Sequence, residues 1–370
     1  MPTDDEWMDR ALGLAKRAWG KTHPNPMVGA LIVEDGELVA EGWHARDGGP
    51  HAERAALAAL GRAPRPGAVM YVTLEPCSTA GRTGACCDAI RAVGIARVVS
   101  GATDPNPAHA GRGLEVLRAA GIAVTAGVRA EVCTELNFIF NHWITTGRPL
   151  LAGKLATTRD GFSRPPAGAN RWITGPEARA DVHYWRRLFP AIAVGAGTVR
   201  ADNPALTRRW RDAAGREQED CGVRFVFDAT LATAAGAPDT WPRVYTDAWR
   251  ERTLVVTSMA ADAAAQEWLE AAGVQVWRQE TTRGAAGWAE FLQRCSDERL
   301  SGVYLEGGAE LLADARAAGV LDYGFWYQSP QVGGAGWGGA APWGEWAEST
   351  TETFGADTLR RGPLKPRNNF

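Results

Sequence analysis

The 370-residue sequence lacks the features of secreted and membrane proteins. Its six cysteines are too few for a disulfide scaffold, and no run of about 18 apolar residues could span a membrane. The opening segment, MPTDDEWMDRALGLAKRAW, is acidic and amphipathic and has no apolar signal-peptide core. We therefore expect a cytoplasmic protein that does not bind or cross a membrane.

The sequence also has no excess of one charge. The 40 Lys and Arg residues nearly balance the 43 Asp and Glu residues, which gives a net charge of −3 and a pI of about 6.1. This balance argues against a broad nucleic-acid-binding surface, so we expect a small-molecule partner and no nucleic acid. The length favours two globular domains rather than one.

Strand and helix signals alternate along both halves of the chain. The apolar runs 27–33 and 38–43 are joined by Glu-Asp-Gly-Glu, and its Asp-Gly pair is typical of a hairpin turn. A change of pattern near residue 147 predicts two α/β domains, 1–147 and 148–370. The Gly- and Trp-rich segment 333–346 is predicted to be a loop. The other expected strands are 69–74, 96–100, 122–125, 191–195, 224–228, 253–257 and 303–305, and helices are expected from 52, from 86, over 113–120 and over 176–188.

The strongest chemical signal is a His-x-Glu at a helix start, followed by Pro-Cys at a strand end and a further cysteine at the next helix start. We interpret His51, Cys77 and Cys86 as ligands of one Zn²⁺ per chain, with a fourth position left for water. Zinc lowers the pKa of bound water to about 7, and Glu53, which is not a ligand, would carry the proton to a leaving amine. Cys87 is an alternative to Cys86, because neighbouring helical residues diverge by about 100° and only one can face the metal.

Two glycine-containing turns stand out in the second half. Gly-Ala-Gly-Thr at 195–198 follows a strand, and Glu-Gly-Gly at 306–308 lies between a strand and a helix. Glycines at such places let backbone N–H groups approach a phosphate. The first turn lacks the third glycine of G-x-G-x-x-G, which disfavours a Rossmann site and leaves a structural tight turn as the alternative.

Longer segments carry a resemblance to a known family. They closely resemble the bifunctional riboflavin-biosynthesis deaminase/reductase, and the eight-residue gap between Cys77 and Cys86 is that family's spacing. The resemblance implies a cytidine-deaminase-like three-layer αβα domain followed by a dihydrofolate-reductase-like α/β domain, and we expect a homo-oligomer, either a dimer or a tetramer. The segments are HPNPMVGALIV at 23–33, EGWH at 41–44, PHAE at 50–53, TLEPCSTAGRTGACCDAI at 73–90, DPNPAHAGRGLEVL at 104–117, NRWITGPEARADVHYWRR at 170–187 and VGAGTVRADNPALTRR at 194–209.

The resemblance also implies the reactions and the site residues. The implied steps are deamination of 2,5-diamino-6-hydroxy-4-(5-phosphoribosylamino)pyrimidine and NADPH-dependent reduction of the ribosyl chain of 5-amino-6-(5-phosphoribosylamino)uracil. By position, deaminase substrate contacts fall on Asn25, His44 and Arg82, reductase substrate contacts on Asn170, Arg186, Leu206, Arg209 and Glu306, and cofactor contacts on Ala156, Trp172, Thr198, Asp202 and Gly308, while Lys154 and Asp160 match the reductase module's Lys and Asp-Gly.

The chain departs from the family pattern at several places. Thr79-Ala80 stands where one or two His are usual, Gly84-Ala85 where Pro-Pro is often found, and Phe162-Ser163 where Arg or Lys then Thr is normal. The resemblance also fades after Pro330. The alternative function is deamination of another nucleobase-like substrate by a chain whose appended reductase domain is inactive. A binding protein with a structural zinc is disfavoured because no fourth ligand is evident.

Overall fold

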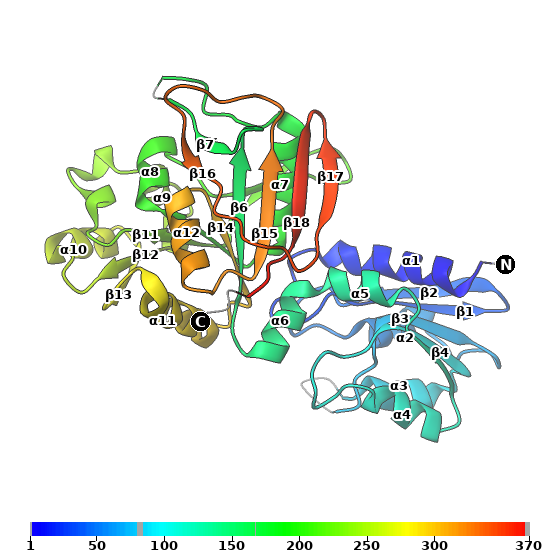
Figure 1. Cartoon of the computed structure of the whole chain (residues 1–370). Helices are drawn as coiled ribbons and strands as arrows, with labels where there is room; N and C mark the ends of the chain where they lie inside the picture. The colour runs from blue at the N-terminus through cyan, green and yellow to red at the C-terminus, as the bar shows by residue number, and fades with distance from the viewer. Residues whose placement is uncertain (1, 80–83, 167, 367–370) are drawn as a thin grey trace. The chain divides into compact units, whose positions relative to one another are not determined.

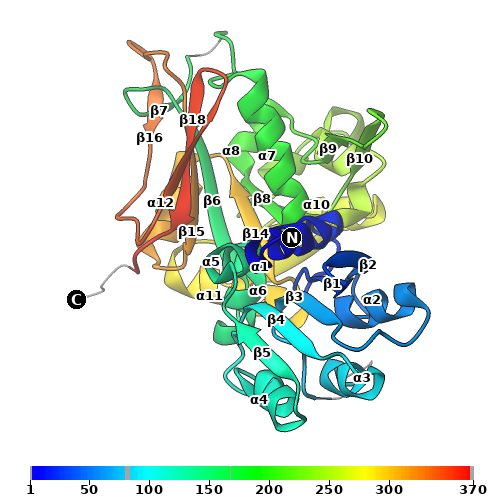
Figure 2. The same ribbon diagram turned by 90° about the vertical axis from the view of Figure 1, so that its right-hand side faces the viewer.

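The computed structural model describes residues 2–79, 84–166 and 168–366. The chain divides into two compact units, Met1–Arg148 and Pro149–Phe370. Each unit is built on its own central sheet, with helices packed on the sheet faces (Figures 1 and 2). Among the described residues, no helix is both long and apolar enough to cross a membrane.

The first unit contains a five-stranded sheet in the order β2-β1-β3-β4-β5. β1 runs antiparallel to β2 and β3, whereas β3, β4 and β5 are parallel. The β1–β2 hairpin turns at Asp35 and Gly36, which both have positive φ, as the Asp-Gly signal predicts. The strands are β1 (Gly29–Glu34), β2 (Glu37–Trp43), β3 (Val69–Leu74), β4 (Arg97–Ala102) and β5 (Ala123–Ala126).

Helices cover both faces of this sheet and give three layers. α1 and α5 pack on one face, and α2, α3 and α4 on the other (Figure 1). α2 lies directly on β2, because a Cβ on Gly42 would come within 2.2 Å of the Ala56 backbone nitrogen. The helices are α1 (Asp4–Ala15), η1 (Lys16–Ala18), α2 (Ala52–Leu60), α3 (Cys86–Val93), α4 (Arg112–Ala119), α5 (Ala130–Leu136) and α6 (Phe138–Thr146).

The second unit contains a nine-stranded sheet in the order β13-β12-β11-β8-β14-β6-β15-β18-β17. Its strands are parallel from β13 to β15. β18 runs antiparallel to β15 on one side and to the edge strand β17 on the other. Two short ribbons, β9–β10 and β7–β16, lie outside it. The strands are β6 (Leu150–Thr157), β7 (Phe162–Arg164), β8 (Ala191–Gly195), β9 (Arg208–Arg211), β10 (Glu217–Asp220), β11 (Val223–Phe227), β12 (Thr253–Ser258), β13 (Gln275–Gln279), β14 (Gly302–Glu306), β15 (Tyr323–Gln328), β16 (Gly338–Ala340), β17 (Thr350–Phe354) and β18 (Asp357–Pro363).

Side chains alternate between the two faces of this sheet and form two cores. Ala191 and Ala193 of β8 join the core beneath α11 and α12, whereas Ile192 and Val194 join the core beneath α8 and α10. α7 packs on the same face as α8, with the ring of its Trp185 5.0 Å from that of Phe325. The helices are α7 (Pro176–Leu188), α8 (Ala196–Asp202), η2 (Ala232–Ala234), η3 (Pro238–Thr240), α9 (Arg243–Thr246), η4 (Arg250–Arg252), α10 (Ala263–Ala271), α11 (Gly284–Asp297) and α12 (Ala309–Ala317).

The Gly- and Trp-rich segment differs from the loop that the sequence predicts. Part of it forms β16, which pairs antiparallel with β7, and the Ser163 hydroxyl donates to the Gly339 carbonyl at 2.7 Å. Gly339 has positive φ, and a Cβ added to it would lie 2.4 Å from that hydroxyl. Glycine therefore permits this pairing, and it also hides the strand from sequence patterns because it supplies no alternating side chains.

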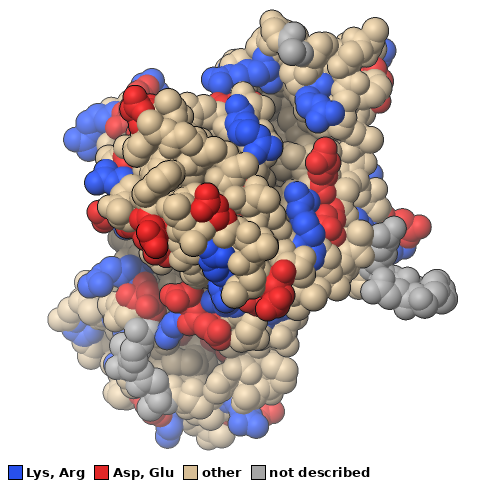
Figure 3. Space-filling view, turned by 90° about the vertical axis from the view of Figure 1, so that its left-hand side faces the viewer, with Lys and Arg blue, Asp and Glu red and all other residues tan. Residues whose placement is uncertain are grey.

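The charges are mixed over the surface drawn in Figure 3. Lys and Arg alternate with Asp and Glu across this face rather than gathering into one basic region. Exposed Arg residues commonly pair with nearby carboxylates, as Arg211 does with Glu217 and Arg216 with Asp212.

Candidate active sites

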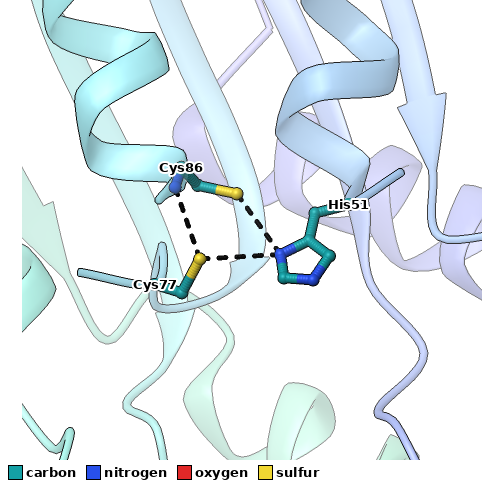
Figure 4. Close-up of side chains that lie close together, drawn as sticks. All are labelled: His51, Cys77 and Cys86. Carbon is teal, nitrogen blue, oxygen red and sulfur yellow. Dashed lines mark hydrogen bonds between the residues drawn. The ribbon is translucent and has the colours of Figure 1, made fainter. Parts of the chain in front are cut away.

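Three side chains from three segments meet in the first unit. His51 is the N-cap of α2, Cys77 follows β3, and Cys86 is the first residue of α3. Figure 4 shows the imidazole and both thiols pointing toward one another. Their ligand atoms all lie within 4.8 Å of each other.

The geometry of this cluster fits a zinc ion. The His51 Nδ1 atom lies 3.6 Å from Cys77 Sγ and 3.4 Å from Cys86 Sγ, and N and S ligands of a tetrahedral zinc are roughly 3.5 Å apart. Hydrogen bonds from the Cys86 thiol and from His51 lower the pKa of Cys77, which favours the thiolate that binds metal. Neutral imidazole and thiolate are the donors that zinc prefers.

Cys87 lies outside the cluster. Its thiol donates to the carbonyls of Pro76 and Gly113, both at 3.4 Å, and burial raises its pKa to about 12. The structure therefore places Cys86, and not its neighbour, with His51 and Cys77.

Glu53 is the second residue of α2 and follows the N-cap His51 by two positions. Only 4% of it is exposed, and this burial raises the pKa of its carboxyl. A carboxyl whose pKa is raised toward neutrality exchanges protons more readily near pH 7. The residue is thus suited to moving protons beside the metal ligands rather than to binding the ion.

Glu75 is a residue of this site whose role sequence reasoning missed. Its buried carboxylate accepts hydrogen bonds from the backbone N–H groups of Asp104 at 3.1 Å, Gly111 at 2.9 Å and Gly113 at 2.8 Å. A Cβ on Gly113 would lie 2.0 Å from the Pro76 carbonyl. Glu75 therefore fixes the 104–113 segment against the backbone that carries Cys77, and a charged residue directly after a buried strand is the signal that could have revealed it.

The expected base-pocket residues are only partly described. The His44 ring lies edge-on to the His51 ring with centroids 5.7 Å apart, and its Nδ1 is 3.0 Å from the Pro50 carbonyl. The Asn25 amide donates to Asp47 at 2.8 Å, a partner that the sequence did not indicate. Arg82 lies outside the described residues.

In the second unit, Arg186 and Glu306 form a buried bidentate ion pair. The Arg186 Nη2 donates to Oε2 of Glu306 at 2.8 Å, and its Nε donates to Oε1. Its Nη1 donates to the Thr207 carbonyl at 3.0 Å. Lys154 of β6 is the register neighbour of Glu306, and burial lowers the pKa of its ammonium. Its Nζ lies 5.8 Å from the Tyr327 ring centroid.

Arg209 extends this cluster toward solvent. Its guanidinium lies 3.3 Å from His183 Nε2, and its backbone N–H faces His183 Nδ1 at 3.3 Å. Burial, with the charges of Arg186 and Arg209, lowers the pKa of His183 to about 4, so this ring is neutral at pH 7. The cationic side chains of Lys154, Arg186 and Arg209 outnumber the Glu306 carboxylate. The site is therefore net positive, which suits a phosphate dianion.

Three of the candidate cofactor residues, Thr198, Asp202 and Gly308, lie in α8 and the turn after β14. Gly307 and Gly308 both have positive φ, and a Cβ on Gly307 would lie 3.1 Å from the Thr198 hydroxyl. Because these two glycines have no side chains, the backbone of the turn is accessible to a phosphate group, as a nucleotide site requires. Asp202, at the end of α8, has its pKa raised by burial, and Trp172 is 50% exposed.

The remaining predicted residues of the reductase site make local contacts within the second unit. Leu206 is 3% exposed within the apolar core beneath α8. Asp160 accepts from the Gly333 N–H at 2.9 Å, and Asn170 accepts from the Trp172 N–H at 3.1 Å. Ala156 pairs with Tyr327 between β6 and β15.

Comparisons with known proteins extend over both units. The profile of the RibD C-terminal domain matches residues 149–348, more than half of the chain, and the profile of the cytidine and deoxycytidylate deaminase zinc-binding region matches residues 1–102. The riboflavin biosynthesis protein RibD of Actinobacillus pleuropneumoniae is 39% identical over 332 residues, which cover 90% of this chain and 85% of that protein. The chain belongs to the RibD family.

Solved RibD structures share the whole fold. Acinetobacter baumannii RibD superposes with a TM-score of 0.78 at 30% identity, covering 98% of this chain and 99% of that one. A Thermotoga maritima diaminohydroxyphosphoribosylaminopyrimidine deaminase/5-amino-6-(5-phosphoribosylamino)uracil reductase matches with a TM-score of 0.78 at 31% identity and the same coverage. Both predicted fold classes are confirmed.

Membership of the RibD family establishes the general function. The chain is a bifunctional riboflavin-biosynthesis enzyme, a zinc-dependent deaminase and an NADPH-dependent reductase. The alternative, an appended inactive reductase behind a different deaminase, is not favoured, because the similarity to RibD proteins continues through both units.

Proposed function

We propose that the first unit deaminates 2,5-diamino-6-hydroxy-4-(5-phosphoribosylamino)pyrimidine and that the second reduces 5-amino-6-(5-phosphoribosylamino)uracil at its ribosyl chain. The observation that carries the proposal is the convergence of His51, Cys77 and Cys86 beside the buried Glu53. The Thermotoga relative, whose name contains both reactions, supports the choice of substrates.

In the deaminase half, His51, Cys77 and Cys86 would hold the metal. Bound Zn²⁺ supplies a Lewis acid that activates water for attack on the amino-bearing ring carbon. Glu53 would take the proton of that water at a carboxylate oxygen and pass it to the leaving amine. Asn25 and His44 would hold the base, and Arg82 the phosphate.

In the reductase half, the cationic cluster would anchor the substrate. Arg186 and Arg209 would bind its phosphate, with Lys154 adding positive charge. Bound NADPH supplies the hydride that reduces C1 of the ribose in its open form. Further substrate contacts would come from Asn170, Leu206 and Glu306, cofactor contacts from Ala156, Trp172, Thr198, Asp202 and Gly308, and Asp160 would support the same site.

The two activities can be tested separately on the full-length protein. We expect ammonia release from the diaminopyrimidine without NADPH, and NADPH oxidation without ammonia release when the deaminated product is supplied directly. Absence of ammonia release from zinc-loaded protein would contradict the deaminase assignment. A homo-oligomer in the cytoplasm also stays a prediction, and light scattering with cell fractionation would test it.

A further inference from the structure

Two arginines flank an exposed tryptophan beside α7. The guanidinium carbon of Arg171 lies 4.8 Å from the Trp172 ring centroid, and that of Arg179 lies 4.6 Å from it. Half of the tryptophan is exposed to solvent. Such cation–π contacts hold guanidinium groups in place without using their N–H donors.

Within the described ranges, neither Arg171 nor Arg179 has an acidic side chain at ion-pairing distance, although the Asp202 carboxylate is near enough to feel the charge of Arg171. Each makes one backbone contact, Arg171 to the Asp202 carbonyl at 3.4 Å and Arg179 to the Thr174 carbonyl at 2.6 Å. Since a guanidinium has five donors, most remain available to a ligand.

The pair lies at the edge where the candidate cofactor residues gather. The contact from Arg171 to Asp202 places it at the end of α8, the helix that also carries Thr198. Thr198 in turn faces the Gly307 turn after β14. Both α8 and this turn follow the carboxyl ends of parallel strands, where ligands bind in open α/β sheets.

We propose that Arg171 and Arg179, held by Trp172, form a subsite for a phosphate group of NADPH. The proposal rests on the cofactor assignment made above and adds the residues that recognise cofactor charge. Each guanidinium attracts a phosphate dianion, and the two attractions add. Guanidinium forks also match phosphate oxygens in geometry better than ammonium groups do.

NADPH carries two kinds of phosphate, a 2′-phosphate and a diphosphate, and NADH carries only the diphosphate. We would titrate full-length protein with both dinucleotides and follow nicotinamide fluorescence. The Arg171→Ala/Arg179→Ala double variant should raise the Kd for NADPH by at least about tenfold. An unchanged Kd for NADH would assign the pair to the 2′-phosphate, and an equal rise for both dinucleotides would assign it to the diphosphate.

Controls separate this subsite from folding and from the general function. Arg294→Ala removes a similar guanidinium, 5.8 Å from the Trp277 ring, and should leave both Kd values unchanged. An Arg171→Gln/Arg179→Gln variant tests loss of charge with less change of volume, and an unaltered calorimetric melting temperature of the second unit reports that this unit is folded. An NADPH Kd within twofold of wild type in both double variants would overturn the subsite. Failure of the wild-type protein to bind NADPH would instead overturn the cofactor assignment.

Discussion

The two candidate sites are assembled in different ways. The metal cluster uses short side chains at the ends of α2, β3 and α3, so the backbone largely fixes the ligand positions. The cationic cluster uses long side chains, and its central pair joins Arg186 to Glu306 across 120 residues. Loss of one zinc ligand removes a coordination bond that cannot be replaced, whereas loss of one arginine leaves other cations in place. We therefore expect steep effects in the first site and graded effects in the second.

The largest expected effects come from the metal site, at Glu53 and Cys77. In Glu53→Gln, removing the proton carrier while keeping the side-chain shape should lower the deamination rate by about 10³-fold and leave about one zinc per chain. Cys77→Ala should lose both zinc and deamination. Ammonia release and metal analysis measure these changes, and NADPH oxidation with the deaminated substrate serves as the internal control. Near wild-type deamination by Glu53→Gln would refute the proposed mechanism.

The next effect tests how firmly the backbone holds Cys77. In Glu75→Gln, an amide nitrogen replaces one carboxylate oxygen and faces backbone N–H groups that it cannot accept from. We expect a 10- to 100-fold fall in deamination, as is usual for groups that support metal ligands, with an unchanged reductase rate. Glu115→Gln, an exposed carboxylate at the start of α4, is the matched control. Equal rates for both variants would show that the 104–113 segment does not support the site.

A smaller effect should appear in the cationic cluster. Arg209→Ala should raise the KM for the reductase substrate by about tenfold, or about 1.4 kcal/mol, with little change in NADPH affinity. Asp202→Ala should weaken NADPH binding with little change in the KM for the reductase substrate. Arg211→Ala, an exposed arginine on the same strand that pairs with Glu217, is the control for charge alone. If Arg209→Ala and Arg211→Ala raise KM equally, Arg209 acts only through general charge.

The smallest effect concerns stability in the second unit. Burial raises the pKa of Asp181 to about 6, and Tyr327 donates to its carboxylate at 2.6 Å. In the unfolded chain the Asp181 carboxyl ionises near pH ~4. Asp181 therefore adds to the free energy of unfolding below that pH, and this contribution is lost as the pH rises to 6. His183, with its pKa lowered to about 4, has the opposite dependence: it loses its contribution as pH falls from 6.5. The two dependences oppose each other in the wild-type protein.

Asp181→Asn should expose the histidine dependence by removing the carboxyl. Relative to wild type, the free energy of unfolding of the variant should rise by about 1 kcal/mol between pH 4 and 6, allowing for solvent screening, and stay level above pH 6. Calorimetric melting temperatures across this range would detect a shift of a few degrees. A difference between variant and wild type that does not vary with pH would show that Asp181 is ionised in the folded protein.

The sequence by itself indicated the proposed zinc ligands and determined the α/β class of each half. His51, Glu53, Cys77 and Cys86 lie at helix and strand ends that follow from local periodicity, so their spacing carries the chemistry before any folding is considered. The alternation of strands and helices determined the α/β class in the same way, because periods of 2 and 3.6 residues are local properties.

Only the tertiary structure decided which distant groups became partners. The sheet register sets Lys154 beside Glu306, and the packing of α7 brings Arg186 onto the same carboxylate. Glu75 likewise meets its donors only when the 104–113 segment folds back over Pro76. Such contacts depend on strand order and close backbone approach across long loops, and no local pattern records these. For that reason the short ligands of the first site were visible in the local sequence pattern. The residues of the second site were implied only by the family resemblance, and the pairing of Arg186 with Glu306 was not predicted.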